Sequence, residues 1–171
     1  MTQALSAQTA QHGNEAQYVT LGIEREVFAV PVEAVLEILD IRPVFHIPEA
    51  PRYMLGLIDL RGRSVPVLDL RTKLGLPQKE ATETTRILVI ETDVGGRPLV
   101  LGLVADRVIE VLPLSASEVE PAPEIGVRWH SEYIAGVGHR NDSFVIIFDL
   151  PKLFSNEDAA LLSNAAVCSP T

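Results

Sequence analysis

The chain has 171 residues, which suits one domain or two small units that share a core, and 47% of them are hydrophobic. No apolar run approaches the roughly 20 residues of a membrane-spanning helix, and a net charge of −9 disfavours contact with nucleic acid or anionic lipid. A single cysteine, Cys168, excludes an intramolecular disulfide and a cysteine metal cluster, in keeping with a reducing cytoplasm.

The chain begins with polar residues that lack the features of a secretory signal, and we expect residues 1–16 to form a disordered tail. Beyond it, short β-branched segments separated by turn residues predict an all-β fold. Two hairpins are expected, the second with a turn in which glycines supply positive φ. Their strands are residues 18–24 with 27–32, and residues 87–92 with 99–105; further strands are expected at 65–70 and 144–150.

Helical signals are few. We expect single helical turns at residues 32–36, 70–74 and 150–154. Ser155 followed by acidic residues is typical of a helix start, and the apolar spacing after it predicts a C-terminal helix at about 156–166, before a flexible end at 167–171.

An internal repeat is the most informative feature of the sequence. Residues 53–75 align with residues 133–155 without a gap at an offset of 80, and residues 32–41 align with 105–114 at an offset of 73. The identical positions include Tyr53/Tyr133, Gly56/Gly136, Asp69/Asp149, Val35/Val108 and Glu37/Glu110.

The repeat predicts a duplicated unit of about five short strands. We therefore expect two small five-stranded barrels packed together, with a first repeat at about 17–80 and a second at about 84–155. The repeat does not indicate whether strands cross between the barrels.

No catalytic motif stands out. The four histidines, His12, His46, His130 and His139, form no metal-ligand pair, and neither a nucleophile elbow nor a phosphate-binding glycine loop is present. Asp69 and Asp149 occupy equivalent positions and are candidates either for paired carboxylates or for helix caps; the helix-like residues that follow favour capping. No cofactor or metal is expected.

The segment at residues 56–76 resembles the signature of CheW-like chemotaxis coupling proteins, in which G-[VI]-x-N-L-R-G precedes a strand ending in D-L-R. Here it reads GLIDLRGRSVPVLDLR, and the resemblance spans roughly residues 16–163, which defines a single CheW-like domain at 17–163. One departure is Asp59, which stands where the family usually has Asn. Asp keeps the acceptor, loses the amide donor and adds a charge that Arg61 or Arg63 could balance.

The resemblance implies two SH3-like barrels that act as a non-catalytic adaptor. Its expected partners are the helical tips of methyl-accepting chemoreceptors, the regulatory domain of the histidine kinase CheA and further CheW copies. It implies a cytoplasmic protein recruited to receptor arrays at the inner membrane face, with no direct membrane insertion and no nucleic acid partner.

Kinase- or receptor-binding residues follow from the same resemblance. Val35, Ile38, Val108 and Val111 are expected to offer a dry seat for a partner helix, with plain core as the alternative. Arg61 suits a carboxylate and has Glu37 as its carry-over partner; the alternative is a solvated surface charge.

The remaining candidates are three glycines and an isoleucine. Gly56 and Gly62 are expected to set the backbone geometry of the binding segment, and Gly102 to let a partner lie close. Ile125, in a proline-rich loop, is an exposed apolar candidate for a second protein contact.

Two alternative functions remain at this point. The chain suits a CheW-like scaffold of a parallel system, for example one controlling type IV pili. It also suits a small-ligand binder or enzyme that uses the cleft between the barrels, with His130, His139 or Asp149 in it.

Overall fold

The computed structural model describes residues 15–121, 133–140 and 142–154. The expected C-terminal helix at 156–166, the end at 167–171 and most of the expected tail lie outside the described residues. The first strand already begins at Glu15, so the prediction of a tail through residue 16 is two residues too long.

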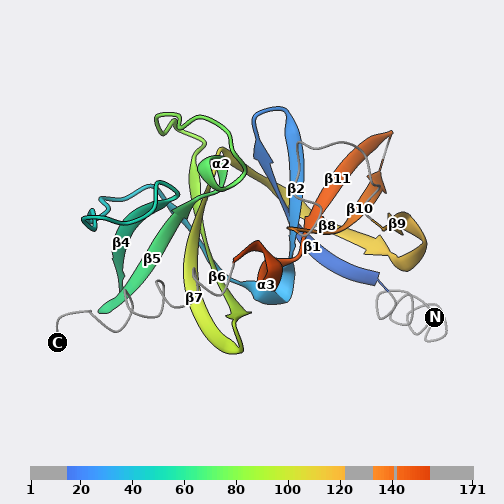
Figure 1. The fold of residues 1–171 in the computed structure, drawn as a ribbon. Helices are drawn as coiled ribbons and strands as arrows, with labels where there is room; N and C mark the ends of the chain where they lie inside the picture. The colour runs from blue at the N-terminus through green and yellow to red at the C-terminus, as the bar shows by residue number, and fades with distance from the viewer. Residues whose placement is uncertain (1–14, 122–132, 141, 155–171) are drawn as a thin grey trace, which may run out of the picture.

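The described chain is almost entirely β-structure, arranged in two curled sheets that lie side by side (Figure 1). One sheet has six strands in the order β8-β1-β2-β11-β10-β9, and the other has five in the order β3-β6-β7-β5-β4. In chain order the elements are β1 (Glu15–Ile23), β2 (Glu26–Pro31), η1 (Val32–Ala34), β3 (Val35–Asp40), β4 (Met54–Leu60), β5 (Arg63–Asp69), α2 (Leu70–Lys73), β6 (Arg86–Val94), β7 (Arg97–Ala105), β8 (Arg107–Ser115), η2 (Ala116–Glu118), β9 (Val119–Glu120), β10 (Ile134–Arg140), β11 (Ser143–Phe148) and α3 (Leu150–Leu153).

Each sheet combines strands from both copies of the repeat. The β1–β2 hairpin joins strands of the second copy, and the β6–β7 hairpin joins strands of the first. Figure 1 shows blue β2 beside orange β11, and green β5 beside yellow-green β7. Both junctions are parallel, with Ala29 opposite Ile147 and Gly102 opposite Val67. The two copies have therefore exchanged their hairpins, and the repeat segments at 17–80 and 84–155 do not coincide with the sheets.

The backbone geometry repeats at the offsets found in the sequence. A bulge interrupts the β4–β5 ladder between Met54 and Gly56, and an equivalent bulge lies 80 residues on, before Gly136. The Asp69 N–H donates to the Tyr53 carbonyl at 2.7 Å, and the Asp149 N–H donates to the Tyr133 carbonyl at 2.8 Å.

Both sheets curl closed through the segment that follows their first edge strand. After β3, Phe45 and Leu57 exchange two backbone hydrogen bonds of 2.8 and 2.9 Å, which links this segment to β4. After β8, the short strand β9 pairs in the same way with β10. The expected five strands are thus present in one sheet, and the other has six because β9 is regular enough to count.

The core has three parts, because the central strands β1, β2, β5, β6 and β7 bury both faces. One cluster fills the space between the sheets and contains Phe28 and Phe148, whose rings stack at 4.9 Å. A second lies within the five-stranded sheet around Ile58 and Val89, and a third lies within the six-stranded sheet around Leu112. Burial on both faces explains why β6 and β7 read as continuous hydrophobic runs in the sequence.

The three predicted helical turns form as η1, α2 and α3, and aspartates cap two of them. The Asp69 carboxylate accepts from the Arg71 N–H at 3.2 Å and from the Thr72 hydroxyl at 2.9 Å at the start of α2. At the start of α3, the Asp149 carboxylate accepts from the Lys152 N–H at 3.3 Å. These bonds confirm capping as the role of the two aspartates.

Candidate functional site

The turn between β4 and β5 presents Arg61 at its tip. Leu60 faces Arg63 across the hairpin, which leaves Arg61 and Gly62 as a two-residue turn. Both have positive φ, 53° and 84°, as a type I′ turn requires. Gly62 adopts positive φ readily because it has no Cβ, whereas for Arg61, which has a Cβ, this conformation is less favourable.

Asp59 closes this turn with its side chain. Its carboxylate accepts from the Gly62 N–H at 3.0 Å, a bond that needs only the acceptor that Asp shares with Asn. The Asp59 carbonyl accepts from the Arg42 guanidinium at 3.4 Å. The replacement of the usual Asn therefore leaves the acceptor of the turn in place.

The Arg61 guanidinium donates to the Glu37 carboxylate on β3 at 3.0 Å. The Arg61 side chain is 76% exposed and that of Glu37 is 28% exposed, so the pair joins β3 to the β4–β5 turn at the surface. The structure thus brings together the two charged residues selected from the sequence, and most of the Arg61 side chain stays open to solvent.

Exposed aliphatic residues flank this pair and recur in the second copy. Ile38 on β3 is 44% exposed, and Val111, 73 residues on in β8, is 53% exposed. Val35 and Val108 are mostly buried and pack against the central core, so core packing describes those two better than a surface role.

Sequence reasoning missed Leu36 and Ile109, which are 53% and 42% exposed. Leu36 is the extra residue of a bulge where β3 pairs β6, and Ile109 is the extra residue where β8 pairs β1. A bulge redirects its extra side chain out of the ladder, so the two copies present the same aliphatic pair. The repeat offset already related these positions; their exposure depends on the bulges. We call Leu36, Ile38, Ile109 and Val111 the aliphatic pairs.

The three glycine candidates have different structural roles: one forms a turn, one allows packing within a sheet and one lies where the sheet closes. Gly62 has no atom near the position of a Cβ. Gly56 is buried with φ of 146°, where a Cβ would lie 2.0 Å from the Phe45 carbonyl oxygen. Gly102 is also buried, with Ile87 and Val67 against it, so the expectation that it lets a partner lie close is corrected: it allows packing within the sheet. Ile125 lies outside the described residues.

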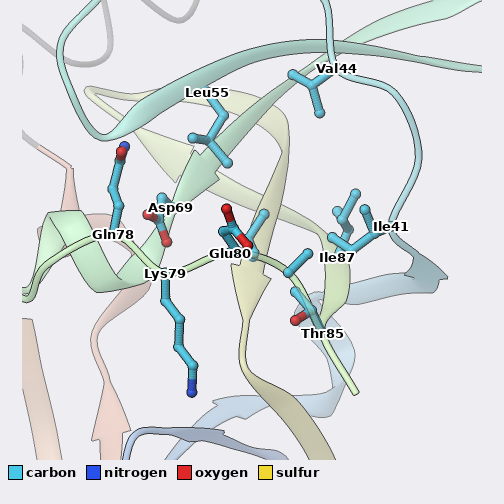
Figure 2. A pocket seen from close by; sticks show the side chains of 11 residues that line it. Ile41, Val44, Leu55, Asp69, Gln78, Lys79, Glu80, Thr85 and Ile87 are labelled. Atoms are coloured by element: carbon cyan, nitrogen blue, oxygen red, sulfur yellow. The ribbon is translucent and has the colours of Figure 1, made fainter. Parts of the chain in front are cut away.

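A pocket of about 360 Å³ opens beside the five-stranded sheet. Its wall is aliphatic, with Val44, Leu55 and Ile87, and the linker residues Gln78 to Glu80 cross it (Figure 2). Figure 2 shows the Lys79 side chain pointing away from Val44 and Leu55. Asp69 also lines the pocket, but both of its oxygens already accept hydrogen bonds in the cap, so it is committed to the fold.

A second pocket, of about 400 Å³, is lined by residues from both sheets, among them Pro31, Thr92 and Asp149. Asp149 is the cap of α3, and His139 lies elsewhere, with its Nε2 3.2 Å from the Glu120 carboxylate. His130 is outside the described residues. Of the three residues suggested for a catalytic or ligand-binding cleft, the two that the structure describes, Asp149 and His139, therefore have different partners.

Within residues 15–121, 133–140 and 142–154, no helix is long and apolar enough to cross a membrane. The same ranges contain no group of three or more His, Cys, Asp or Glu side chains placed to hold a metal ion.

Comparison with known proteins places these features in context. The family model described as CheW-like domain matches residues 17–158. The chain is 36% identical over 154 residues to the chemotaxis protein CheW of Klebsiella aerogenes, covering 90% of this chain and 89% of that protein. It is 28% identical to the chemotaxis protein CheW of Treponema pallidum, covering 91% of each. The solved structure of the scaffolding protein TtCheW from Thermoanaerobacter tengcongensis superimposes with a TM-score of 0.73 at 28% identity, covering 82% of this chain and 92% of that one.

Proposed function

The chain belongs to the CheW-like domain family, and we propose that it couples chemoreceptors to the histidine kinase CheA without catalysing a reaction. Its fold is the double β-barrel of this family, and its function is that of a chemotaxis adaptor. Support for the adaptor role comes from relatives named CheW that match most of the chain.

The receptor-binding surface in this proposal consists of Arg61, Glu37 and the aliphatic pairs. A partner helix would lay an apolar face on the aliphatic pairs, since they are exposed in both copies. Arg61 would bind a carboxylate of the partner through the part of its guanidinium that Glu37 leaves open. The observation that carries the proposal is this Arg61–Glu37 pair beside Leu36 and Ile38.

The second partner in the proposal is the regulatory domain of CheA, and further copies of the chain are a third. Binding to receptors would recruit the protein from the cytoplasm to arrays at the inner membrane face. The described residues carry no spanning helix, so this recruitment would act through protein contacts.

The test is a titration of the chain against a chemoreceptor cytoplasmic fragment and the kinase regulatory domain, separately and together. We expect binding to both, and we expect Arg61→Glu to weaken receptor binding at least tenfold with an almost unchanged melting temperature. Arg97→Glu is the matched control, because it makes the same change at an exposed arginine beside another hairpin turn. Arg97 follows the turn of the β6–β7 hairpin, in the position that Arg63 has in the β4–β5 hairpin. Binding to neither protein would refute the adaptor role, and normal binding by Arg61→Glu would refute the assigned surface.

A further inference from the structure

The β4–β5 turn holds Arg61 in a conformation that needs support. A residue with a Cβ at positive φ costs about 1 kcal/mol or more relative to the right-handed region, and Arg61 has φ of 53°. The carboxylate of Asp59 binds the Gly62 N–H at 3.0 Å, on the residue that follows. This bond favours the turn over extended alternatives, in which the same N–H would point elsewhere.

From this geometry we infer that Asp59 is a positioning residue, which holds Arg61 in the orientation that binds the receptor. This inference rests on the proposed function. Asp59 acts through the turn, because its carboxylate accepts a hydrogen bond from the Gly62 N–H, whereas the Arg61 guanidinium donates to Glu37. An acceptor at position 59 is the requirement, and a negative charge there is dispensable.

A second hairpin provides the contrast. Asp93 stands two residues before the Gly95-Gly96 turn, as Asp59 stands two residues before Arg61-Gly62, and each is exposed. The β6–β7 turn reaches φ of 61° and 83° with glycines alone. Because glycine adopts positive φ without a penalty, this turn needs no side-chain acceptor. Asp93→Ala therefore makes the same chemical change at the same hairpin position without touching the proposed surface.

The experiment measures the affinity of a chemoreceptor cytoplasmic fragment for the wild type and for Asp59→Ala, Asp59→Asn and Asp93→Ala. We expect Asp59→Ala to weaken binding about fivefold, the size of one hydrogen bond. Asp59→Asn keeps the acceptor and should bind within twofold of the wild type or more tightly, because it removes a negative charge beside Arg61. Asp93→Ala should bind as the wild type does. Equal affinities for Asp59→Ala and the wild type would overturn the inference.

A double-mutant cycle separates positioning from a general loss of stability. If Asp59 acts through Arg61, the substitution Asp59→Ala should cost no further affinity in a protein that already carries Arg61→Ala. The same fivefold loss in both backgrounds would show that Asp59 acts independently and would contradict the inference.

Hydrogen exchange at the Gly62 amide supplies a readout that does not depend on the receptor. Asp59→Ala should speed this exchange at least fivefold, and Asp59→Asn should leave it nearly unchanged. Should the wild type fail to bind the fragment, the proposed function fails, and the exchange rate still decides whether Asp59 holds the turn. An unchanged rate in Asp59→Ala would overturn the inference regardless of receptor binding.

Discussion

The guanidinium of Arg71 lies 2.8 Å from the carboxylate of Asp106, the residue at which the chain passes from one sheet to the other. The same guanidinium also binds Glu24, in the β1–β2 turn, and the Pro77 carbonyl at 2.9 Å. Burial alone would lower the pKa of Arg71, but the hydrogen bonds and charges of Glu24 and Asp106 outweigh it and raise the pKa. Arg71 is therefore charged at any physiological pH and links α2 to both exchanged hairpins.

Replacing Arg71 by Met should destabilise the fold by about 3 kcal/mol, because the substitution leaves partly buried acceptors without their donor. Arg71→Lys should cost less, since it keeps the charge but cannot reach all three partners. Urea unfolding followed by circular dichroism measures both. Arg25→Met, at an exposed arginine in the adjacent turn, is the control and should change stability by less than about 0.5 kcal/mol. A loss for Arg71→Met no larger than for the control would show that the ion pairs do not stabilise the exchange of hairpins.

The aliphatic pairs should matter for binding and little for folding. Ile38→Glu and Val111→Glu should each lower the affinity for the receptor fragment at least tenfold, because a charge would be buried against an apolar helix face. Their melting temperatures should stay within a few degrees of the wild type, since both side chains are about half exposed. Calorimetry and a binding titration on the same samples measure the two effects.

Phe144→Ser is the control for these two variants. Phe144 is 63% exposed on β11, and Ser64 stands at the equivalent position of the first copy, so serine is compatible with the fold. Receptor binding by this variant should equal that of the wild type. A comparable loss in all three variants would show that surface hydrophobicity in general, rather than the aliphatic pairs, governs binding.

The stability of the fold should fall at alkaline pH through Tyr18. Burial and the nearby charge of Glu33 raise the pKa of Tyr18 above its usual value of about 10. The folded state therefore holds the phenol proton more tightly than the unfolded state does. The resulting stabilisation is complete below about pH 10 and is lost as pH rises through the folded pKa.

Tyr18→Phe lacks this proton, so the wild type should lose more stability than the variant between pH 8 and pH 10.5. Urea unfolding at the two pH values measures the difference, and Tyr53 and Tyr133 contribute equally to both proteins. Parallel losses of stability in the two proteins would contradict the role given to Tyr18.

The local structure of this fold follows closely from the sequence. Turn residues located the β1–β2 and β6–β7 hairpins, and Asp69 and Asp149 located two helical turns, because these signals act within a few residues. The pair of Arg61 and Glu37 was selected by resemblance to a family and is close in space.

Three features depended on information that the sequence pattern lacks. The exchange of hairpins leaves the repeat offsets unchanged, so the alignment is the same whichever sheet a hairpin joins. The exposure of Leu36 and Ile109 depends on bulges, which shift the alternation of faces by one residue. Gly102 was expected at a binding surface, because the sequence around it does not show that Ile87 of β6 and Val67 of β5 pack against it.

The two glycines of the β4–β5 hairpin should differ sharply in their tolerance of alanine. At Gly56 a Cβ would lie 2.0 Å from the Phe45 carbonyl oxygen, which belongs to the backbone link that closes the sheet, and φ is 146°. Gly56→Ala must break this link or distort β4, so we expect a loss of at least about 3 kcal/mol in urea unfolding.

The Cβ of Gly62→Ala would meet no atom within 4 Å, so the only penalty is its φ of 84°. This variant should therefore lose about 1 kcal/mol of stability in urea unfolding. Because both variants add one methyl group at positive φ in the same hairpin, the difference between them measures the backbone contact with Phe45. Similar losses in the two variants would mean that the sheet can close without this contact, and that conformational strain alone selects glycine at both positions.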